Sequence, residues 1–169
     1  MNHYLLGSAI MPSVLLVWFF HRRDLYPEPA RVLWTTFFLG VLTVIPVLAV
    51  VYPYSQYMEL VEDPFLSGAV TAFAGAAIPE EFFKYLVVVF YCARHKEFDE
   101  PMDGIVYGVV ASLGFATLEN ILYVSDGGYT VALLRALTAV PGHALTGAFV
   151  GYFIGQAKFG EGSSRRNWM

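Results

Sequence analysis

The stretch MDGIVYGVVASLGFATLENILY, residues 102–123, has no charged side chain between Asp103 and Glu119 and carries a small residue at every fourth position of its first part. About 20 apolar residues in a helix span the ~30 Å hydrocarbon core of a bilayer. Residues four apart lie on one helix face, and small residues let membrane helices approach closely. The row consists of Gly104, Gly108, Ser112 and Ala116. The stretch therefore predicts a tightly packed membrane helix with polar Glu119 and Asn120 near its end.

The whole chain has the composition of a membrane protein. Of its 169 residues 57% are hydrophobic and 14% charged, and the mean hydropathy is +0.55, whereas roughly a quarter of the residues in soluble domains are charged. The net charge of −4 and the scattered Lys and Arg residues give no basic surface for nucleic acid. The single cysteine, Cys92, cannot form an internal disulfide and indicates a buried, reduced thiol. We predict an all-α, polytopic membrane protein.

Five apolar segments are long enough to cross a bilayer, and they form a single transmembrane domain over residues 1–169. The segments are 3–20, 32–52, 67–92, 104–124 and 131–157. Eight of the ten Lys and Arg residues lie on one predicted side, in 21–31, 93–103 and the tail after 157. The loops of the other side, 53–66 and 125–130, contain none. Because positive residues are retained on the cytoplasmic side, we predict a multi-pass protein of the cell (plasma) membrane with its N-terminus outside and its C-terminus inside.

Ionisable residues inside these spans are candidates for function because they are costly in a membrane. Measured from the cytoplasmic end at ~1.5 Å per residue, Glu81 lies about 17 Å deep, Glu119 about 22 Å and His143 about 21 Å. Glu80 and Lys84 accompany Glu81 on the third span. Three spans therefore bring ionisable groups to one level.

Arg135 lies near 33 Å by the same count, and we expect it to anchor its helix in the headgroups of the far interface. Rows of small residues also occur beside the other polar residues: Gly68, Ala72 and Ala76 before Glu80, and Gly147, Gly151 and Gly155 after His143. The polar residues are therefore expected to face other helices rather than lipid. Asp103, at the start of the fourth span, is most simply an N-cap.

Helix-breaking residues precede two of the polar positions, since Pro79 comes before Glu80 and Pro141 lies two residues before His143. A proline frees a backbone carbonyl, which in a membrane must be satisfied by other protein groups or by water. We therefore expect both sites to line a wet cavity.

Such a cavity would support the hydrolysis of an amide bond. Glu80 and Glu81 are expected to share a proton as a coupled pair, with Lys84 offsetting one negative charge. One carboxylate would activate water, His143 would act on the carbonyl or the leaving amine, and Asn120 would donate to the oxyanion.

Two alternatives compete with this mechanism and this function. In the first, His143 together with Glu80 or Glu81 and with Glu119 holds a divalent metal such as zinc, with an open position for water. In the second, a transporter, a proton pathway or a non-catalytic scaffold uses the same buried polar cluster. A transporter predicts internally repeated halves, and no convincing repeat is present in the sequence.

Three pieces of the sequence resemble the PrsW family of membrane-embedded proteases, which are distant relatives of the CAAX prenyl proteases. These are PEEFFKYL (79–86), MDGIVYGVVASLGFATLENILY (102–123) and RALTAVPGHALTGAFVGYFIG (135–155). The family's EExxK motif falls on Glu80, Glu81 and Lys84, its FxxxEN motif on Phe115, Glu119 and Asn120, and its membrane histidine on His143.

The resemblance covers about residues 70–157, the expected catalytic core. It implies a peptidase that cuts a membrane-anchored substrate, such as an anti-sigma factor, in regulated intramembrane proteolysis. Family members are labelled metalloproteases, whereas the CAAX relatives look like enzymes in which glutamate activates water. Relatives continue into a further membrane helix with another histidine, which this sequence does not contain. The expected partners are a single-span membrane protein and membrane lipid.

Overall fold

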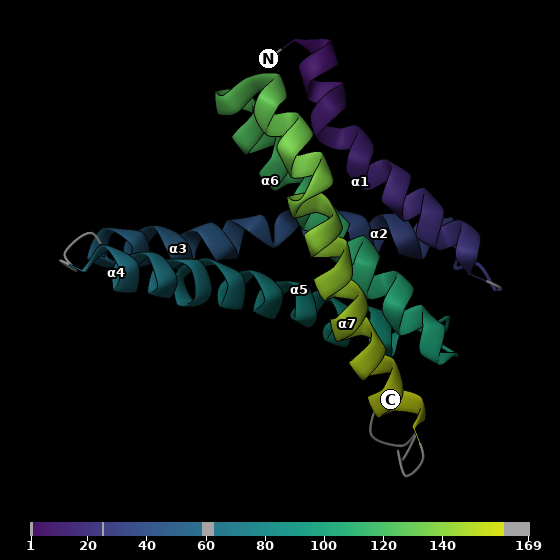
Figure 1. Ribbon diagram of the computed structural model, residues 1–169. Coiled ribbons are helices and arrows are strands. Elements are labelled where there is room, and N and C mark those ends of the chain that lie inside the picture. Colours follow the sequence, from purple (N-terminus) through teal and green to yellow (C-terminus); the bar gives the residue numbers. More distant parts are fainter. Residues whose placement is uncertain (1, 25, 59–62, 161–169) are drawn as a thin grey trace.

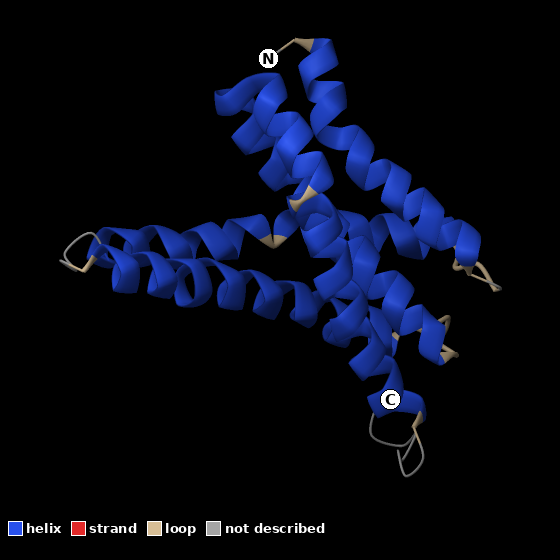
Figure 2. Ribbon diagram, viewed as in Figure 1, coloured by secondary structure: helices blue, strands red, loops and turns tan. Residues whose placement is uncertain are grey.

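The computed structural model describes residues 2–24, 26–58 and 63–160, and within these ranges every regular element is a helix (Figures 1 and 2). The elements are α1 (His3–Arg23), α2 (Ala30–Leu42), α3 (Val44–Met58), α4 (Pro64–Val70), the π-helix η1 (Thr71–Ala77), α5 (Ile78–Phe90), the 3₁₀ turn η2 (Cys92–Arg94), α6 (Pro101–Leu137) and α7 (Ala139–Phe159). The predicted all-α class is confirmed.

Helices α6 and α7 form a long hairpin at the centre of the molecule. Gly128 lies inside α6 with φ 66° and ψ −157°, a backbone conformation that residues with a Cβ rarely adopt. The chain reverses there, and residues 129–159 return antiparallel to 101–127 (Figure 1). The hairpin has almost no loop because the reversal uses a single glycine.

Glycine pairs hold the two arms of this hairpin in backbone contact. Gly104 faces Gly151, Gly108 faces Gly147, and a Cβ added to any of the four would collide with the backbone oxygen opposite it. Close approach of this kind replaces the hydrophobic driving force that is missing between helices in lipid. The small-residue rows predicted for the fourth and fifth spans are confirmed.

The third predicted row lies on a different face from the one expected. Gly68 and Ala72 are exposed, and Gly75 instead lies against the ring of Tyr54 on α3. The reason is η1, because a π-helix closes i→i+5 hydrogen bonds and a four-residue spacing does not follow one of its faces. The prediction for Gly68 and Ala72 was wrong.

Helices α1 and α2 pack along α6, which is buried almost without interruption from Asp103 to Thr117. Gly114 lies against the backbone oxygen of Phe37 on α2. Beyond a break at Thr43, α3 continues away from the centre and lies beside α4 and η1, which are at the left of Figure 1. Cys92 is fully buried as predicted, and its thiol lies 3.3 Å from the Thr36 hydroxyl.

Three helical segments of the described chain are long and apolar enough to cross a membrane: His3–Arg23, Ala30–Tyr54 and Pro101–Phe159. The last contains both arms of the α6–α7 hairpin. The predicted segment 67–92 is divided among α4, η1 and α5, so no single helix there reaches that length. The count of five spans and the orientation stay predictions.

Asp103 is not the N-cap of α6 but its third helical residue. Glu100 is the N-cap, and the two form a capping box. The Asp103 carboxylate accepts hydrogen bonds from the backbone N–H groups of Asp99 and Glu100, both at 2.8 Å. The capping role predicted for Asp103 is therefore correct in kind, and the helix begins three residues earlier than expected.

Candidate active site

The first turn of α5 presents two of the predicted glutamates. Pro79 is the second residue of α5, which follows η1 directly. Proline is tolerated in the first turn of a helix because its fixed φ angle already suits the helix. Glu80 and Glu81 follow at partly buried positions, and Lys84 lies one turn later with only 2% of its surface exposed.

Lys84 joins the third span to the fifth. Its Nζ donates to Glu81 Oε1 at 2.6 Å and lies 3.1 Å from Nδ1 of His143. It also lies 4.7 Å from the ring centre of Phe115 on α6, a favourable cation–π contact. An ammonium group has no acceptor, so a charged Lys84 requires Nδ1 of His143 to accept and a neutral imidazole to carry its proton on Nε2.

That Nε2 faces the carboxylate of Glu119 at 3.0 Å. The resulting chain runs from Glu81 through Lys84 and His143 to Glu119, and it links α5, α7 and α6 in that order. The structure therefore brings together Glu80, Glu81, Lys84, Glu119 and His143, as the depth estimates from the sequence predicted.

The Arg135 side chain is bound within the polar cluster and does not extend away from it as an interfacial anchor would. Its Nη2 donates to Glu119, and its Nε donates to Asn120 Oδ1 at 2.6 Å. The hairpin explains the difference, because Glu119 and Arg135 lie at similar distances before and after the reversal at Gly128. The long side chain reaches back to a carboxylate that is itself only 17% exposed, where an unpaired charge would be costly.

Asn120 does not face the cluster with a free donor. Its Nδ2 donates to the backbone oxygen of Ala9 on α1 at 3.2 Å, and its Oδ1 accepts from Arg135. The side chain is fully buried. Both ends of the amide are used, so the predicted oxyanion donor instead orients Arg135 and ties α1 to the site.

Glu80 differs from the other two glutamates. Glu81 accepts from Lys84 and from the Thr146 hydroxyl at 3.1 Å, and Glu119 is held by Arg135 and His143. Within the described part of the chain, the Glu80 carboxylate makes no hydrogen bond or ion pair with another side chain. It is therefore the carboxylate left available to water, substrate or a metal ion.

One carboxylate oxygen each of Glu80 and Glu119 and a ring nitrogen of His143 lie within 4.8 Å of one another. Two carboxylates and an imidazole match the ligands that divalent zinc takes in catalytic sites. The three residues thus fit a divalent ion. Glu81, which the sequence analysis also included among the ligands, is not part of this group.

Arg135 and Thr146 are the two members of the site that the sequence analysis did not place there. A signal for Arg135 was present, since it is a cation inside an apolar segment and its nearest carboxylate needs a partner. Thr146 lies three residues after His143, on the neighbouring position of the same helix face. A lone threonine in an apolar helix carries no comparable signal.

Comparison with known proteins identifies the site's family. Residues 28–169 match the model of the family described as PrsW family intramembrane metalloprotease. The chain belongs to the PrsW family. The Protease PrsW of Geobacillus kaustophilus is 44% identical over 156 residues, which cover 92% of this chain and 67% of the relative.

Two further relatives extend the similarity across other bacteria. The Protease PrsW of Bacillus subtilis is 36% identical over 166 residues, covering 98% of this chain and 74% of the relative. That of Clostridioides difficile is 31% identical over 170 residues, covering 95% and 69%. No solved structure matches this chain. Membership of the PrsW family makes the chain a membrane-embedded peptidase, and it favours this reading over the transporter and the scaffold.

Proposed function

We propose that residues 70–157 form the catalytic core and hydrolyse a peptide bond of a single-span membrane protein, with Glu80 as the general base. The observation that carries the proposal is that the Glu80 carboxylate lies beside Glu119 and His143 and forms no hydrogen bond or ion pair with another side chain of the described residues. Glu81 is engaged by Lys84 and Thr146 and positions Lys84.

The reaction follows from these roles. Glu80 takes a proton from water while the water oxygen bonds to the scissile carbonyl carbon, and the carbonyl electrons move onto its oxygen. When the C–N bond breaks, the proton passes from Glu80 to the leaving amine. The cations nearest the developing oxyanion are Lys84 and Arg135, and the Arg135 side chain is the more accessible, at 16% exposed against 3%.

The balance of charges in the cluster supports Glu80 as the group that accepts a proton during the reaction. Three carboxylates, Glu80, Glu81 and Glu119, face the cations Lys84 and Arg135. One negative charge therefore has no lysine or arginine to balance it, and in a low-dielectric site the uptake of a proton from water by Glu80 relieves this excess. A divalent ion held by Glu80, Glu119 and His143 would supply Lewis-acid chemistry that polarises the scissile carbonyl.

A groove between α5 and α7 supports entry of the substrate from the side. A cavity of about 320 Å³ is lined by residues of the two helices, among them Tyr85, Val89, Val150 and Phe153. Tyr85 and Val150 also border the space beside Glu81 and Lys84. That space has no room for a water molecule, so α5 and α7 must separate for an extended substrate segment to reach the cluster from this groove.

The proposed location is the cell membrane, with several passes. Pro101–Phe159 is 59 residues long, and as one helix it would measure about 89 Å, roughly three times the ~30 Å hydrocarbon core. Its antiparallel arms support two separate crossings, in agreement with the five-span topology. The orientation is tested by introducing a single reactive cysteine in the 53–66 loop or in the 93–103 loop and labelling it from each side of the membrane.

The function is tested with purified protein and a single-span substrate. Glu80→Gln should lower kcat by roughly 10²- to 10⁴-fold, the usual contribution of a general base, with KM nearly unchanged. Glu81→Gln should cost less, because it removes a positioning contact. Glu97→Gln, on the loop before α6, is the matched control and should keep full activity. Full activity in Glu80→Gln would refute the proposal, whatever the effect of Glu81→Gln.

Elemental analysis of the purified protein, followed by chelation and metal add-back, decides whether Glu80, Glu119 and His143 act without a metal ion or hold one. Activity that survives complete removal of metal supports glutamate alone. Activity lost on chelation and restored by zinc supports the ion.

A further inference from the structure

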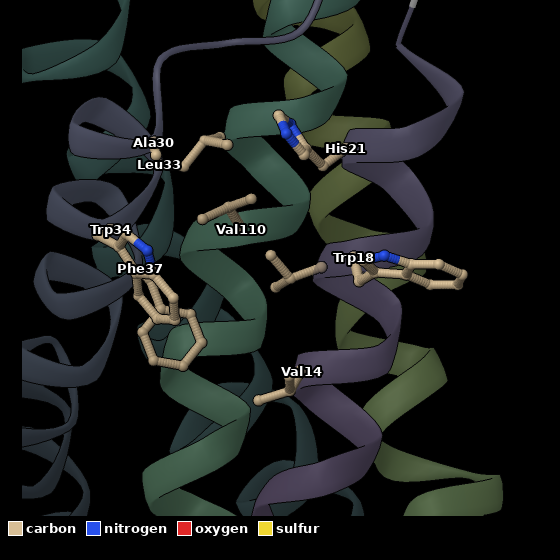
Figure 3. A pocket seen from close by; sticks show the side chains of 9 residues that line it. Val14, Trp18, His21, Ala30, Leu33, Trp34, Phe37 and Val110 are labelled. Carbon is tan, nitrogen blue, oxygen red and sulfur yellow. The ribbon is translucent and has the colours of Figure 1, made fainter.

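A second cavity lies between α1 and α2, with α6 as its floor (Figure 3). Its volume is about 270 Å³, and it shares no residue with the glutamate cluster. We call it the α1–α2 groove. Its walls are almost entirely apolar and include Val14, Val17 and Trp18 of α1, Leu33 and Trp34 of α2, and Val110 of α6.

The groove is short. It follows α1 from Val14 to His21, a distance of about 10 Å at 1.5 Å per residue. A membrane-spanning helix would need a contact surface of ~30 Å, whereas about 10 Å of apolar wall suits part of one extended hydrocarbon chain.

Each wall of the groove carries a tryptophan with an arginine one turn nearer to the α1–α2 connection. On α1 the guanidinium of Arg22 lies 5.3 Å from the centre of the Trp18 ring. On α2 Arg31 comes three residues before Trp34, and both arginines are exposed. Tryptophan is enriched at the membrane interface, and arginines just beyond it meet the lipid phosphates.

The other polar groups at this end of the groove also suit a lipid phosphate. Asp24 and Glu28 of the connection are only 6% and 5% exposed, so the exposed charged residues within 21–24 and 26–31 are all arginines. His21 lines the same end (Figure 3). Its buried Nδ1 has no hydrogen-bond partner in residues 2–24, 26–58 and 63–160. A phosphate or ester oxygen at the mouth of the groove would provide one.

We propose that the α1–α2 groove is a binding site for an anionic glycerophospholipid. One acyl chain lies against Val17 and Val110, and the phosphate lies at the rim between Arg22 and Arg31. The acyl chain gains little over bulk lipid, because lipid tails are as apolar as the groove wall. Selectivity therefore comes from the headgroup, and the site prefers an anionic lipid over a zwitterionic one.

Trp18 and Trp34 are built-in reporters for the test. Full-length protein carrying Trp168→Phe is reconstituted in phosphatidylcholine with brominated acyl chains, which quenches tryptophan fluorescence on contact. Unbrominated phosphatidylglycerol or unbrominated phosphatidylcholine is then added in parallel. Phosphatidylglycerol should restore fluorescence at a severalfold lower mole fraction than phosphatidylcholine does.

The rim is tested with two double variants of equal charge. Arg22→Gln/Arg31→Gln should lower the preference for phosphatidylglycerol by roughly fivefold for each arginine. Arg94→Gln/Lys96→Gln, which removes two exposed charges from the segment before α6, should leave it unchanged. Equal recovery with the two lipids would overturn the proposal. So would an equal loss of preference in both double variants, because the effect would then come from surface charge in general.

Discussion

The contact of Arg135 with Glu119 and Asn120 leads to a sharp prediction about stability. Arg135→Gln leaves the Glu119 carboxylate with His143 as its remaining partner and removes the charged donor to Asn120. Removing one partner of a buried ion pair costs about 3–5 kcal/mol. The two side chains are 16% and 17% exposed, so we expect a loss of about 2–4 kcal/mol in the free energy of unfolding.

Arg135→Lys separates charge from geometry. Lysine keeps the positive charge but cannot contact Glu119 and Asn120 with two fixed donors. The expected loss is about 1–2 kcal/mol, between the wild type and Arg135→Gln. The measurement is equilibrium unfolding in mixed micelles, followed by far-ultraviolet circular dichroism across a titration with sodium dodecyl sulfate.

Arg94→Gln is the matched control, because Arg94 is exposed and its guanidinium lies over the Phe90 ring at 5.0 Å. Its effect should stay within about 0.5 kcal/mol. A double-mutant cycle of Arg135→Gln with Glu119→Gln should show a coupling of at least about 1 kcal/mol. If Arg135→Gln matches Arg94→Gln, or if the two changes are additive, Arg135 lies at the interface and the reasoning fails.

Three further predictions concern other parts of the fold. Burial raises the pKa of Glu28 from 4.5 to about 8, so unfolding releases a proton between these values. The free energy of unfolding should then fall by up to a few kcal/mol as the pH rises from 5 to 8, and Glu28→Gln should flatten this dependence. Gly151→Ala should lower the free energy of unfolding by about 1–3 kcal/mol because its Cβ meets the Gly104 backbone. Gly7→Ala, with open space around it, should raise the free energy of unfolding by up to about 1 kcal/mol. Equal effects of the two substitutions would contradict the hairpin contact. Cys92, fully buried, should react with a maleimide only on unfolding, and rapid labelling of the folded protein would show that its site is open.

The course of the chain around Gly128 shows where sequence reasoning stops. Rows of glycine in 104–108 and 147–151 correctly predicted a close helix pair, because only small residues allow backbone contact between membrane helices. The reversal was predicted within residues 125–130, and the structure places it at Gly128. The register of the two arms was not predicted: Gly104 faces Gly151, whereas the depth estimates were counted from residues 104 and 157. Arg135 was therefore placed well beyond the level of Glu119.

The π-helix before α5 is a second case. Periodicity arguments assume 3.6 residues per turn, and η1 departs from this over Thr71–Ala77. The face of the third span was therefore predicted incorrectly before Pro79, although Glu80, Glu81 and Lys84 beyond it were placed correctly at the level of the cluster.

The sequence alone determined that this is a helical membrane protein, and it identified the positions of the polar cluster. Both follow from local chemistry, since charges inside apolar segments must be paired with one another or exposed to water. Only the tertiary structure decided how the carboxylates are used. Glu81 is paired with Lys84 of its own helix, and Glu119 is paired with Arg135 and His143 from the returning arm of the hairpin. Among the described residues, the Glu80 carboxylate has no such partner. That difference depends on side-chain distances between helices, which no spacing within one helix specifies.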